Sequence, residues 1–422
     1  MKIHFIGIGG IGVSGLANLY LEKGCFVSGS DKEASEITEP LKKKGAKVFI
    51  GHKQSNIARD VDLVIYSEAV PENNPELKKA KSLGIKTLSG AQAVAEFTRD
   101  YFLIAVSGMH GKTTTASMAA KLLVDVGLDP TYIIGTKNGF RLGKSKYLII
   151  EADDYKAKLL NYHPDILLLT NIEEEHMDCF KDLEHILKVF KQYIGQVKQV
   201  IIANQKDSNI KKVIASAKCK KILYSKVNFR LAVPGAHNQE NAAAVMELAK
   251  ALKVDLKKAE SSLKNYQGTW RRLEEKQLAI GSMPLAVVSD YAHHPTEIKA
   301  SVQAIKEKYP KKKILLVFQP HQYQRTFYLF DRFIEAFKTL SPVLKQVIIT
   351  DIYTVKGRES AILKKKVSAQ KLVKAINKVN INYLPEKELL SFIKGNIKGF
   401  DVLVIMTAGN IYKIVENISP SS

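Results

Sequence analysis

The residues with the clearest chemical meaning form one short run, SGMHGKTTT, at positions 107–115. In a glycine-rich loop of this type, backbone N–H groups and the lysine surround the phosphates of a nucleotide, and the hydroxyl after the lysine can hold Mg²⁺. Val106 stands where the usual phosphate-loop pattern has its first glycine. We predict that the loop binds a nucleoside triphosphate. The predicted contacts are Gly108, Met109, His110, Gly111, Lys112, Thr113 and Thr114.

A carboxylate and an imidazole follow two apolar runs further along the chain. Glu151 comes after the run at 147–150, and His176 follows the run at 166–169. In an open α/β sheet, ligands bind beyond the carboxyl ends of the strands, where the phosphate loop also lies. We therefore predict that Thr113, Glu151 and His176 bind a divalent metal ion. The alternative is that Glu151 is a charge near a helix start and that His176 is a surface histidine.

A second glycine-rich run, GIGGIG, covers positions 7–12 and follows the apolar run at 2–6. An acidic residue, Asp31, stands about 20 positions further on, at the end of a second apolar run. This spacing is typical of the dinucleotide fold, in which the glycine turn binds a pyrophosphate. NAD is only one of the molecules that carry a pyrophosphate. The predicted substrate contacts are Gly9, Gly10, Ile11, Gly12 and Asp31.

The elements that must position these residues fall into three segments. In each segment, apolar runs of strand length alternate with helical patterns, which predicts mostly parallel sheets flanked by helices. We predict an α/β fold of three domains: a Rossmann-like domain at 1–99, a central P-loop ATPase-type domain with a mostly parallel sheet at 100–272, and a Rossmann-like C-terminal domain at 273–422. The predicted strands are 2–6, 26–29, 48–50 and 63–66, then 102–106, 147–150, 166–169 and 200–202, then 285–288, 314–318, 347–349 and 402–406.

Composition limits the class of protein. The 422 residues are 45% hydrophobic and 25% charged, and no apolar run approaches the ~20 residues that span a bilayer. We therefore expect a cytoplasmic protein without membrane insertion. The net charge of +22 would suit a nucleic-acid partner, but the lysines are scattered in short runs, as at 42–44, 311–313 and 364–366, so we expect no nucleic-acid binding. The three cysteines are far apart in sequence, which predicts ordinary thiols.

Nine motifs, taken in order along all three segments, resemble those of the ATP-dependent Mur ligases. They are GIGGIGVSGLA (7–17), YSEAVPENNPE (66–76), SGMHGKTTT (107–115), EADD (151–154), TNIEEEHMD (170–178), PGAHNQENAAA (234–244), GTWRRLE (268–274), SDYAHHPTE (289–297) and FQPHQYQRT (318–326). The resemblance is closest to the members that add the first amino acid in peptidoglycan synthesis. It implies that ATP and Mg²⁺ drive the joining of L-alanine to the carboxylate of UDP-N-acetylmuramate through an acyl phosphate, with release of ADP and phosphate.

The resemblance also implies roles for individual residues. The implied catalytic residues are Lys112, Arg272, His293, His321 and Arg325. Beyond the phosphate loop, the implied nucleotide contacts are His237, Asn241, Arg272 and Asp290. Ser67 joins the glycine turn on the UDP-sugar side, and Tyr291, His293 and Arg325 match the amino-acid end. A base that accepts the proton of the attacking amine would be His293 or His321, and the sequence does not choose between them.

The chain departs from the family pattern at three places, one of which is TAGNI (407–411), where the family stretch usually ends in aspartate. Gln322 stands where the family often has arginine, which leaves Arg325 as the arginine of FQPHQYQRT that would pair with an incoming carboxylate. Glu68 follows Ser67 where the family commonly has serine. Three alternatives stay open: the family member that adds a preformed tripeptide to UDP-N-acetylmuramate, an NAD-dependent oxidoreductase, and an ATP-driven nucleic-acid protein. The sequence leaves the oligomeric state undetermined.

Overall fold

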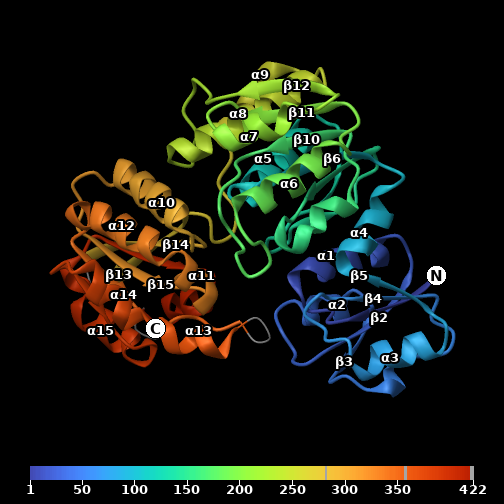
Figure 1. Cartoon of the computed structure of the whole chain (residues 1–422), viewed down its shortest axis with the longest axis horizontal. Coiled ribbons are helices and arrows are strands. Elements are labelled where there is room, and N and C mark those ends of the chain that lie inside the picture. Colours follow the sequence, from blue (N-terminus) through green and yellow to red (C-terminus); the bar gives the residue numbers. More distant parts are fainter. Residues whose placement is uncertain (281–282, 356–358, 419–422) are drawn as a thin grey trace. The chain divides into compact units, whose positions relative to one another are not determined.

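Three β-sheets, each accompanied by helices, form the framework of the computed structural model, which confirms the predicted three-domain α/β fold (Figure 1). The structure describes residues 1–280, 283–355 and 359–418. Within it the chain forms two compact units. Residues 173–185, 226–241 and 264–272 lie in the predicted central domain but belong to the second unit. The first unit comprises Met1–Ile172, Ile186–Ser225 and Ala242–Leu263, and the second comprises Glu173–His185, Lys226–Asn241 and Lys264–Ser422.

The first sheet has five parallel strands in the order β3-β2-β1-β4-β5. The chain turns to one side of β1 to form β2 and β3, and to its other side to form β4 and β5. Ligands of open sheets bind at such a reversal, beyond the carboxyl ends of the two strands. The glycine turn follows β1 and Ser67 follows β4, so both lie at this edge. The elements are β1 (Lys2–Ile6), α1 (Ile11–Glu22), β2 (Phe26–Asp31), α2 (Thr38–Lys43), β3 (Lys47–Ile50), β4 (Leu63–Tyr66), α3 (Pro75–Ser82), β5 (Lys86–Ser89) and α4 (Gly90–Thr98).

The central sheet has the strand order β12-β11-β10-β6-β9-β7-β8, and only the β7–β8 pair is antiparallel. Strand β6 lies between β9 and β10, with Val106 opposite Glu151 and Ser107 opposite Leu169. The loops after these three strands therefore leave from one edge of the sheet, as predicted. The elements are β6 (Phe102–Ser107), α5 (Lys112–Asp125), β7 (Thr131–Ile133), β8 (Phe140–Arg141), β9 (Tyr147–Glu151), β10 (Ile166–Leu169), α6 (Leu183–Ile194), β11 (Val200–Asn204), α7 (Ser208–Ile214), β12 (Lys220–Tyr224), α8 (Ala236–Ala251) and α9 (Leu256–Lys264).

The third sheet has the order β13-β14-β18-β15-β16-β17, with only the edge strand β13 antiparallel to its neighbour. Alternate side chains of β14 enter two different cores: Ala286 and Val288 pack in one buried cluster, and Leu285 and Val287 in the other. The first cluster includes residues of α10, α12 and α14, whereas the second includes residues of α15, so helices cover both faces. The elements are β13 (Glu274–Ile280), β14 (Met283–Asp290), α10 (Pro295–Lys308), β15 (Ile314–Gln319), α11 (Tyr323–Tyr328), α12 (Phe330–Leu340), β16 (Gln346–Ile349), α13 (Ala361–Lys366), α14 (Ala369–Ile376), β17 (Ile381–Tyr383), α15 (Leu389–Asn396) and β18 (Val402–Thr407).

The structure bears on two expectations that came from the composition. Cys25, Cys179 and Cys219 are free thiols, as predicted. Among the helices of the described residues, none combines the length and the apolar character needed to cross a membrane.

Candidate active site

Two glycines and the end of strand β10 fix the shape of the phosphate loop. Gly108 has φ +131°, and a Cβ atom there would lie only 2.8 Å from the carbonyl oxygen of Asn171, so no larger residue fits. The carbonyl and side-chain oxygens of Asn171 accept hydrogen bonds from the N–H groups of Met109 (3.1 Å) and His110 (2.8 Å). These two N–H groups hold the loop. The start of α5 has no side-chain cap at Gly111, so its N–H groups suit an anion. The nucleotide contacts of Met109 and His110 stay predictions.

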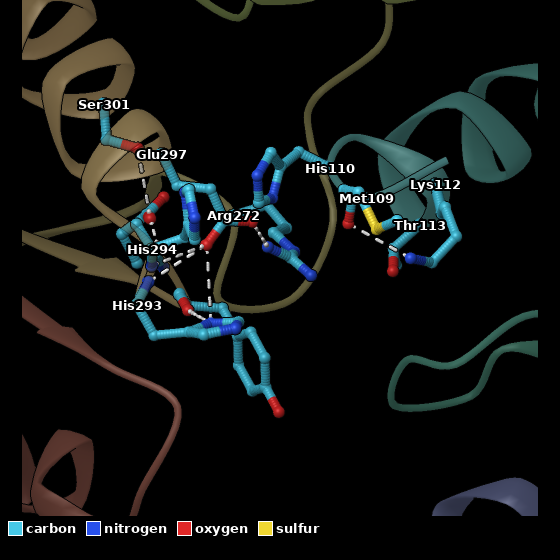
Figure 2. Close-up of polar contacts among 12 residues, drawn as sticks. Met109, His110, Lys112, Thr113, Arg272, His293, His294, Glu297 and Ser301 are labelled. Atoms are coloured by element: carbon cyan, nitrogen blue, oxygen red, sulfur yellow. Dashed lines mark hydrogen bonds and ion pairs between the residues drawn. The ribbon is translucent and has the colours of Figure 1, made fainter. Parts of the chain in front are cut away.

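The ammonium group of Lys112 lies within its own loop (Figure 2). It donates to the carbonyl oxygens of Gly108 (2.6 Å) and Met109 (3.1 Å), and it lies 2.7 Å from Oδ1 of Asp154, whose side chain is fully buried. Burial alone would lower the pKa of Lys112, but the nearby carboxylates, Asp154 first among them, raise it. The lysine is therefore charged, and an entering phosphate would replace these oxygens with its own.

Thr113 and Glu151, two of the three predicted metal ligands, lie side by side. The Thr113 hydroxyl donates to Oε2 of Glu151 at 3.0 Å, and Oε1 of Glu151 accepts the N–H of Gly135 at 2.7 Å. A hydroxyl and a carboxylate at this separation are the oxygen donors that Mg²⁺ prefers. His176, the third predicted ligand, belongs to the second unit, where its backbone has φ +55°. The three-residue metal site stays a prediction.

The glycine turn of the first sheet is closed by the end of β2. The N–H of Gly7 donates to the carbonyl oxygen of Ser30, and the N–H of Gly9 donates to Oδ2 of Asp31, both at 2.8 Å. The other carboxylate oxygen of Asp31 accepts the N–H of Lys32 at 2.7 Å. The sequence analysis predicted a substrate contact for Asp31. In the structure both carboxylate oxygens shape the turn, and the substrate contact stays a prediction.

Helix α1 begins directly after this turn. Its N-cap residue, Gly10, makes no side-chain hydrogen bond, and the first turn, which includes Ile11 and Gly12, contains no acidic residue. The positive end of the helix dipole is therefore available for an anion. Ser67 lies beside the turn, since a Cβ atom on Gly10 would be 3.6 Å from its hydroxyl. The Glu68 carboxylate instead accepts a backbone N–H at the start of α4 (3.0 Å), which explains how an acid is tolerated next to Ser67.

In the second unit, Asp290 organises the chain beside Arg272. Its carboxylate accepts the N–H groups of Leu273 (2.8 Å) and Ala292 (2.7 Å) and the hydroxyl of Ser301 (3.2 Å). Burial raises the pKa of Asp290, although the charge of Arg272 opposes this. The resemblance implied a nucleotide contact for Asp290. Its contacts in the structure are internal, so they favour a role in positioning the segment around Arg272.

Arg272 and His293 lie near the start of helix α10 (Figure 2). Tyr291 contacts both of them. The guanidinium of Arg272 lies over the Tyr291 ring at 4.8 Å and 4.0 Å from Oε1 of Glu297. Nδ1 of His293 is 2.9 Å from the carbonyl oxygen of Tyr291. A carbonyl only accepts, so Nδ1 carries the proton and Nε2 the lone pair. Burial lowers the pKa of His293 to about 4 despite the opposing charge of Glu297, so the ring is neutral at neutral pH.

Arg325 is buried, with 8% of its surface exposed, and it is held from two sides. Its Nε donates to Oε1 of Glu175 at 2.9 Å, and its Nη1 donates to Nδ1 and to the carbonyl oxygen of His321 at 3.0 and 3.1 Å. The sequence analysis expected Arg325 to pair bidentately with an incoming carboxylate. In the structure Glu175 binds Nε, so the edge formed by Nε is not available for that pairing. Gln322 is also buried and begins α11 with φ +71°.

The residues predicted on the adenine side lie at the start of helix α8. Asn241 donates to the side-chain oxygen of Asn238 at 3.5 Å, and Asn238 donates to the carbonyl oxygen of Pro234 at 2.7 Å. Burial lowers the pKa of His237, although the charge of Glu240 opposes this. The local contacts thus order the first turn of the helix, and the nucleotide contact of His237 and Asn241 stays a prediction.

Sequence reasoning missed three residues that the structure places at the centre of these contacts. Asn171 holds the phosphate loop, Asp154 pairs with Lys112, and Glu175 pairs with Arg325. All three stand inside motifs that the sequence did single out, EADD and TNIEEEHMD. Each motif contains several acids, and nothing in the spacing says which acid contacts the base.

Comparison with known proteins covers nearly the whole chain. The sequence matches the family models described as Mur ligase family, catalytic domain (residues 2–102), Mur ligase middle domain (residues 106–232) and Mur ligase, glutamate ligase domain (residues 271–409). The chain belongs to the Mur ligase family. UDP-N-acetylmuramate–L-alanine ligases of Acetivibrio thermocellus and Clostridium acetobutylicum are 39% and 36% identical to this Mur ligase over 98% of its length, covering 94% and 96% of their own.

Solved structures of other Mur ligases have the same fold. The UDP-N-acetylmuramate–alanine ligase of Thermotoga maritima superposes with a TM-score of 0.79 at 25% identity, covering 99% of this chain and 98% of that one. A murein peptide ligase of Psychrobacter arcticus reaches 0.74 at 22% identity, with the same coverage. At that identity the second likeness shows the fold alone.

Proposed function

We propose that this Mur ligase joins L-alanine to the carboxylate of UDP-N-acetylmuramate, using ATP and releasing ADP and phosphate. The observation that carries the proposal is the full-length similarity, at 39% identity, to a curated ligase of that name. The phosphate loop with Lys112 and the uncapped start of α1 supply two anion-binding positions that suit ATP and the pyrophosphate of a UDP-sugar.

The first half of the reaction makes the carboxylate reactive. A carboxylate oxygen of UDP-N-acetylmuramate attacks the γ-phosphorus, the bond from that phosphorus to the β-phosphate oxygen breaks, and ADP leaves with its electron pair. The product is an acyl phosphate. Lys112 would offset charge on the transferring group, since its ammonium already lies among oxygens in the loop, and Arg272 would add a second positive charge.

Thr113 and Glu151 fit a magnesium ion in this half-reaction. Their oxygens are 3.0 Å apart, at the edge of the sheet from which the phosphate loop leaves. Both are hard oxygen donors, and we propose that they hold Mg²⁺ together with His176. When bound, the ion would neutralise phosphate charge.

The second half forms the amide. The neutral amine of L-alanine attacks the acyl carbon, a tetrahedral intermediate forms, and phosphate leaves with the electrons of the broken C–O bond, while the amine gives up one proton. His293 and Tyr291 lie together and suit the amino-acid end. With its lone pair on Nε2, His293 offers an acceptor for an amine N–H.

The test is phosphate release by the purified protein with ATP, Mg²⁺ and UDP-N-acetylmuramate, with amino acids supplied one at a time. We expect turnover with L-alanine, and a coupled product with the mass of the alanyl derivative. Turnover with a preformed tripeptide and none with L-alanine would instead favour the recycling ligase. The curated relatives named above are alanine ligases, which supports the first outcome. No turnover with any acceptor would reject the proposal.

A further inference from the structure

Glu175 is a buried acid near the proposed amino-acid end, and no role in the reaction has been given to it so far. Its side chain is 4% exposed and that of Arg325 is 6% exposed, and Nε of Arg325 lies 2.9 Å from Oε1 of Glu175. The two residues are 150 positions apart in sequence. A fully buried ion pair is expensive in desolvation, so its presence calls for a reason beyond stability.

The pair reaches a third residue, His321, and fixes its protonation. Arg325 is always charged and only donates, so Nδ1 of His321, 3.0 Å from Nη1 of Arg325, must accept. A neutral imidazole that accepts at Nδ1 carries its proton on Nε2. His321 is therefore a hydrogen-bond donor through Nε2, the opposite tautomer from that of His293. This removes His321 as a candidate for the base that accepts the proton of the amine.

The Glu175–Arg325 link of this arrangement is enclosed, since both side chains are buried. The cavity beside the pair has a volume of about 10 Å³ and is lined by Glu175, His176, Gln322 and Arg325, among others. That volume holds one water molecule at most.

We propose that Glu175 is a positioning residue for the amino-acid half of the reaction. It holds Arg325 by Nε, so that Arg325 fixes His321 as a donor. Nη2 of Arg325 and Nε2–H of His321 then serve as the donors for the carboxylate of the incoming amino acid. The inference rests on the proposed function, and it names how that site recognises an α-carboxylate in a chain that has Gln322 where the family often has a second arginine.

The central test is Glu175→Gln, which keeps the shape and an acceptor for Nε but removes the charge. We expect the KM for L-alanine to rise about 10- to 100-fold, because the arginine loses its charged anchor. The KM values for ATP and UDP-N-acetylmuramate should stay within about 2-fold, since these are bound elsewhere. Glu175→Asp should recover part of the loss. The matched control is Glu174→Gln, whose side chain is exposed and should leave all three KM values unchanged.

Two results would overturn the proposal. Glu175 also accepts the backbone N–H of His176 at 3.0 Å, so a change in Mg²⁺ requirement with an unchanged alanine KM would show that it acts through His176 instead. The second test is Glu175→Leu with Arg325→Met, which should fold because an apolar pair replaces the buried ions. If this double variant has a normal alanine KM, the pair is only structural.

Failure of the proposed function is distinguishable from failure of this inference. It would be seen in the wild-type protein, as absence of coupling to L-alanine. Independently of turnover, imidazole ¹⁵N shifts report the tautomer of His321, with His321→Gln to assign the signal. We expect the Nε2–H form in the wild-type protein and exchange between both tautomers in Glu175→Gln. A wild-type signal from the Nδ1–H form would overturn the inference.

Discussion

Lys112 is held in place by the folded chain itself. Its ammonium contacts two carbonyls of its own loop and the buried carboxylate of Asp154. This arrangement keeps a charged lysine in a partly enclosed site. It also means that the lysine serves the folded structure as well as the nucleotide.

We therefore expect Lys112→Ala to abolish ligation and also to lower the free energy of unfolding by about 3 kcal/mol, because Asp154 loses its buried ion pair with Lys112. Urea denaturation and phosphate release would measure the two effects. The double variant Lys112→Met with Asp154→Leu should recover stability while staying inactive. Ligation by either variant at a near-normal rate would remove Lys112 from the mechanism.

A second prediction concerns the metal. Glu151→Gln keeps the size and shape of the side chain but replaces the charged metal-binding oxygen with a neutral one. The Mg²⁺ concentration needed for half-maximal activity should therefore rise about 10-fold or more. Asp153→Asn is the matched control, since the Asp153 side chain is half exposed and paired with Lys158. Equal Mg²⁺ dependence in Glu151→Gln and the wild-type protein would place the metal elsewhere.

His293 gives a prediction about pH and stability. Burial lowers its pKa from 6.5 to about 4, so between these values the unfolded chain binds a proton that the folded chain does not. The free energy of unfolding is therefore undiminished above pH 6.5, and it falls by about 3 kcal/mol in all as the pH drops from 6.5 toward 4. Unfolding free energies measured at intervals across that range should fall more steeply for the wild-type protein than for His293→Gln. Parallel curves would mean that the ring is charged in the folded state.

At the scale of elements, strand ends form the candidate site because three strands end at the same edge of the central sheet. Strand β6 ends in the phosphate loop, β9 ends at Glu151, and the segment after β10 holds the loop through Asn171. No side chain fits at Gly108, because the segment after β10 passes within contact distance of it. The elements therefore shape the loop as much as its own glycines do.

This close approach predicts that Gly108→Ala destabilises the protein by about 1–3 kcal/mol and weakens nucleotide binding, since a Cβ would collide with the β10 segment at a φ of +131°. Gly395→Ala is the control. A Cβ there meets nothing within 4 Å, and in helix α15 alanine should stabilise by about 0.5–1 kcal/mol. Thermal unfolding with and without ATP measures both. A Gly108→Ala protein with unchanged melting temperature and ATP response would contradict the proposed loop geometry.

At the scale of the whole molecule, the net charge of +22 suits substrates that are all anionic or carry a carboxylate. ATP and the UDP-sugar carry several negative charges, whereas L-alanine is a zwitterion. We expect kcat/KM for UDP-N-acetylmuramate to fall about 3- to 10-fold as ionic strength rises from about 0.02 to about 0.3 M, because the attraction is screened. The value for L-alanine should change little. An equal fall for both substrates would point to a loss of folded enzyme instead of a loss of attraction.

The three sheets and the positions of the loops were predictable because their signals are local. Three signals each depend on only a few neighbouring residues. They are an apolar run of strand length, a glycine at a position of positive φ, and a polar residue directly after a strand. The resemblance of nine motifs, in order along the chain, indicated the family. The short strands β7, β8 and β17 were not predicted, because two or three residues carry no periodic pattern. The longer strands β5, β12 and β13 were missed as well.

The sequence by itself determined which motifs lie at the edges of the sheets, and only the tertiary structure decided which acid meets which base. Asp154 pairs with Lys112 across 42 positions, and Glu175 pairs with Arg325 across 150. Asp31 accepts the N–H of Gly9 across 22 positions, a contact that its spacing did not predict. Such pairings depend on which neighbouring acid is buried. Burial is set by the packing of segments far apart in the chain, and a sequence motif does not record it.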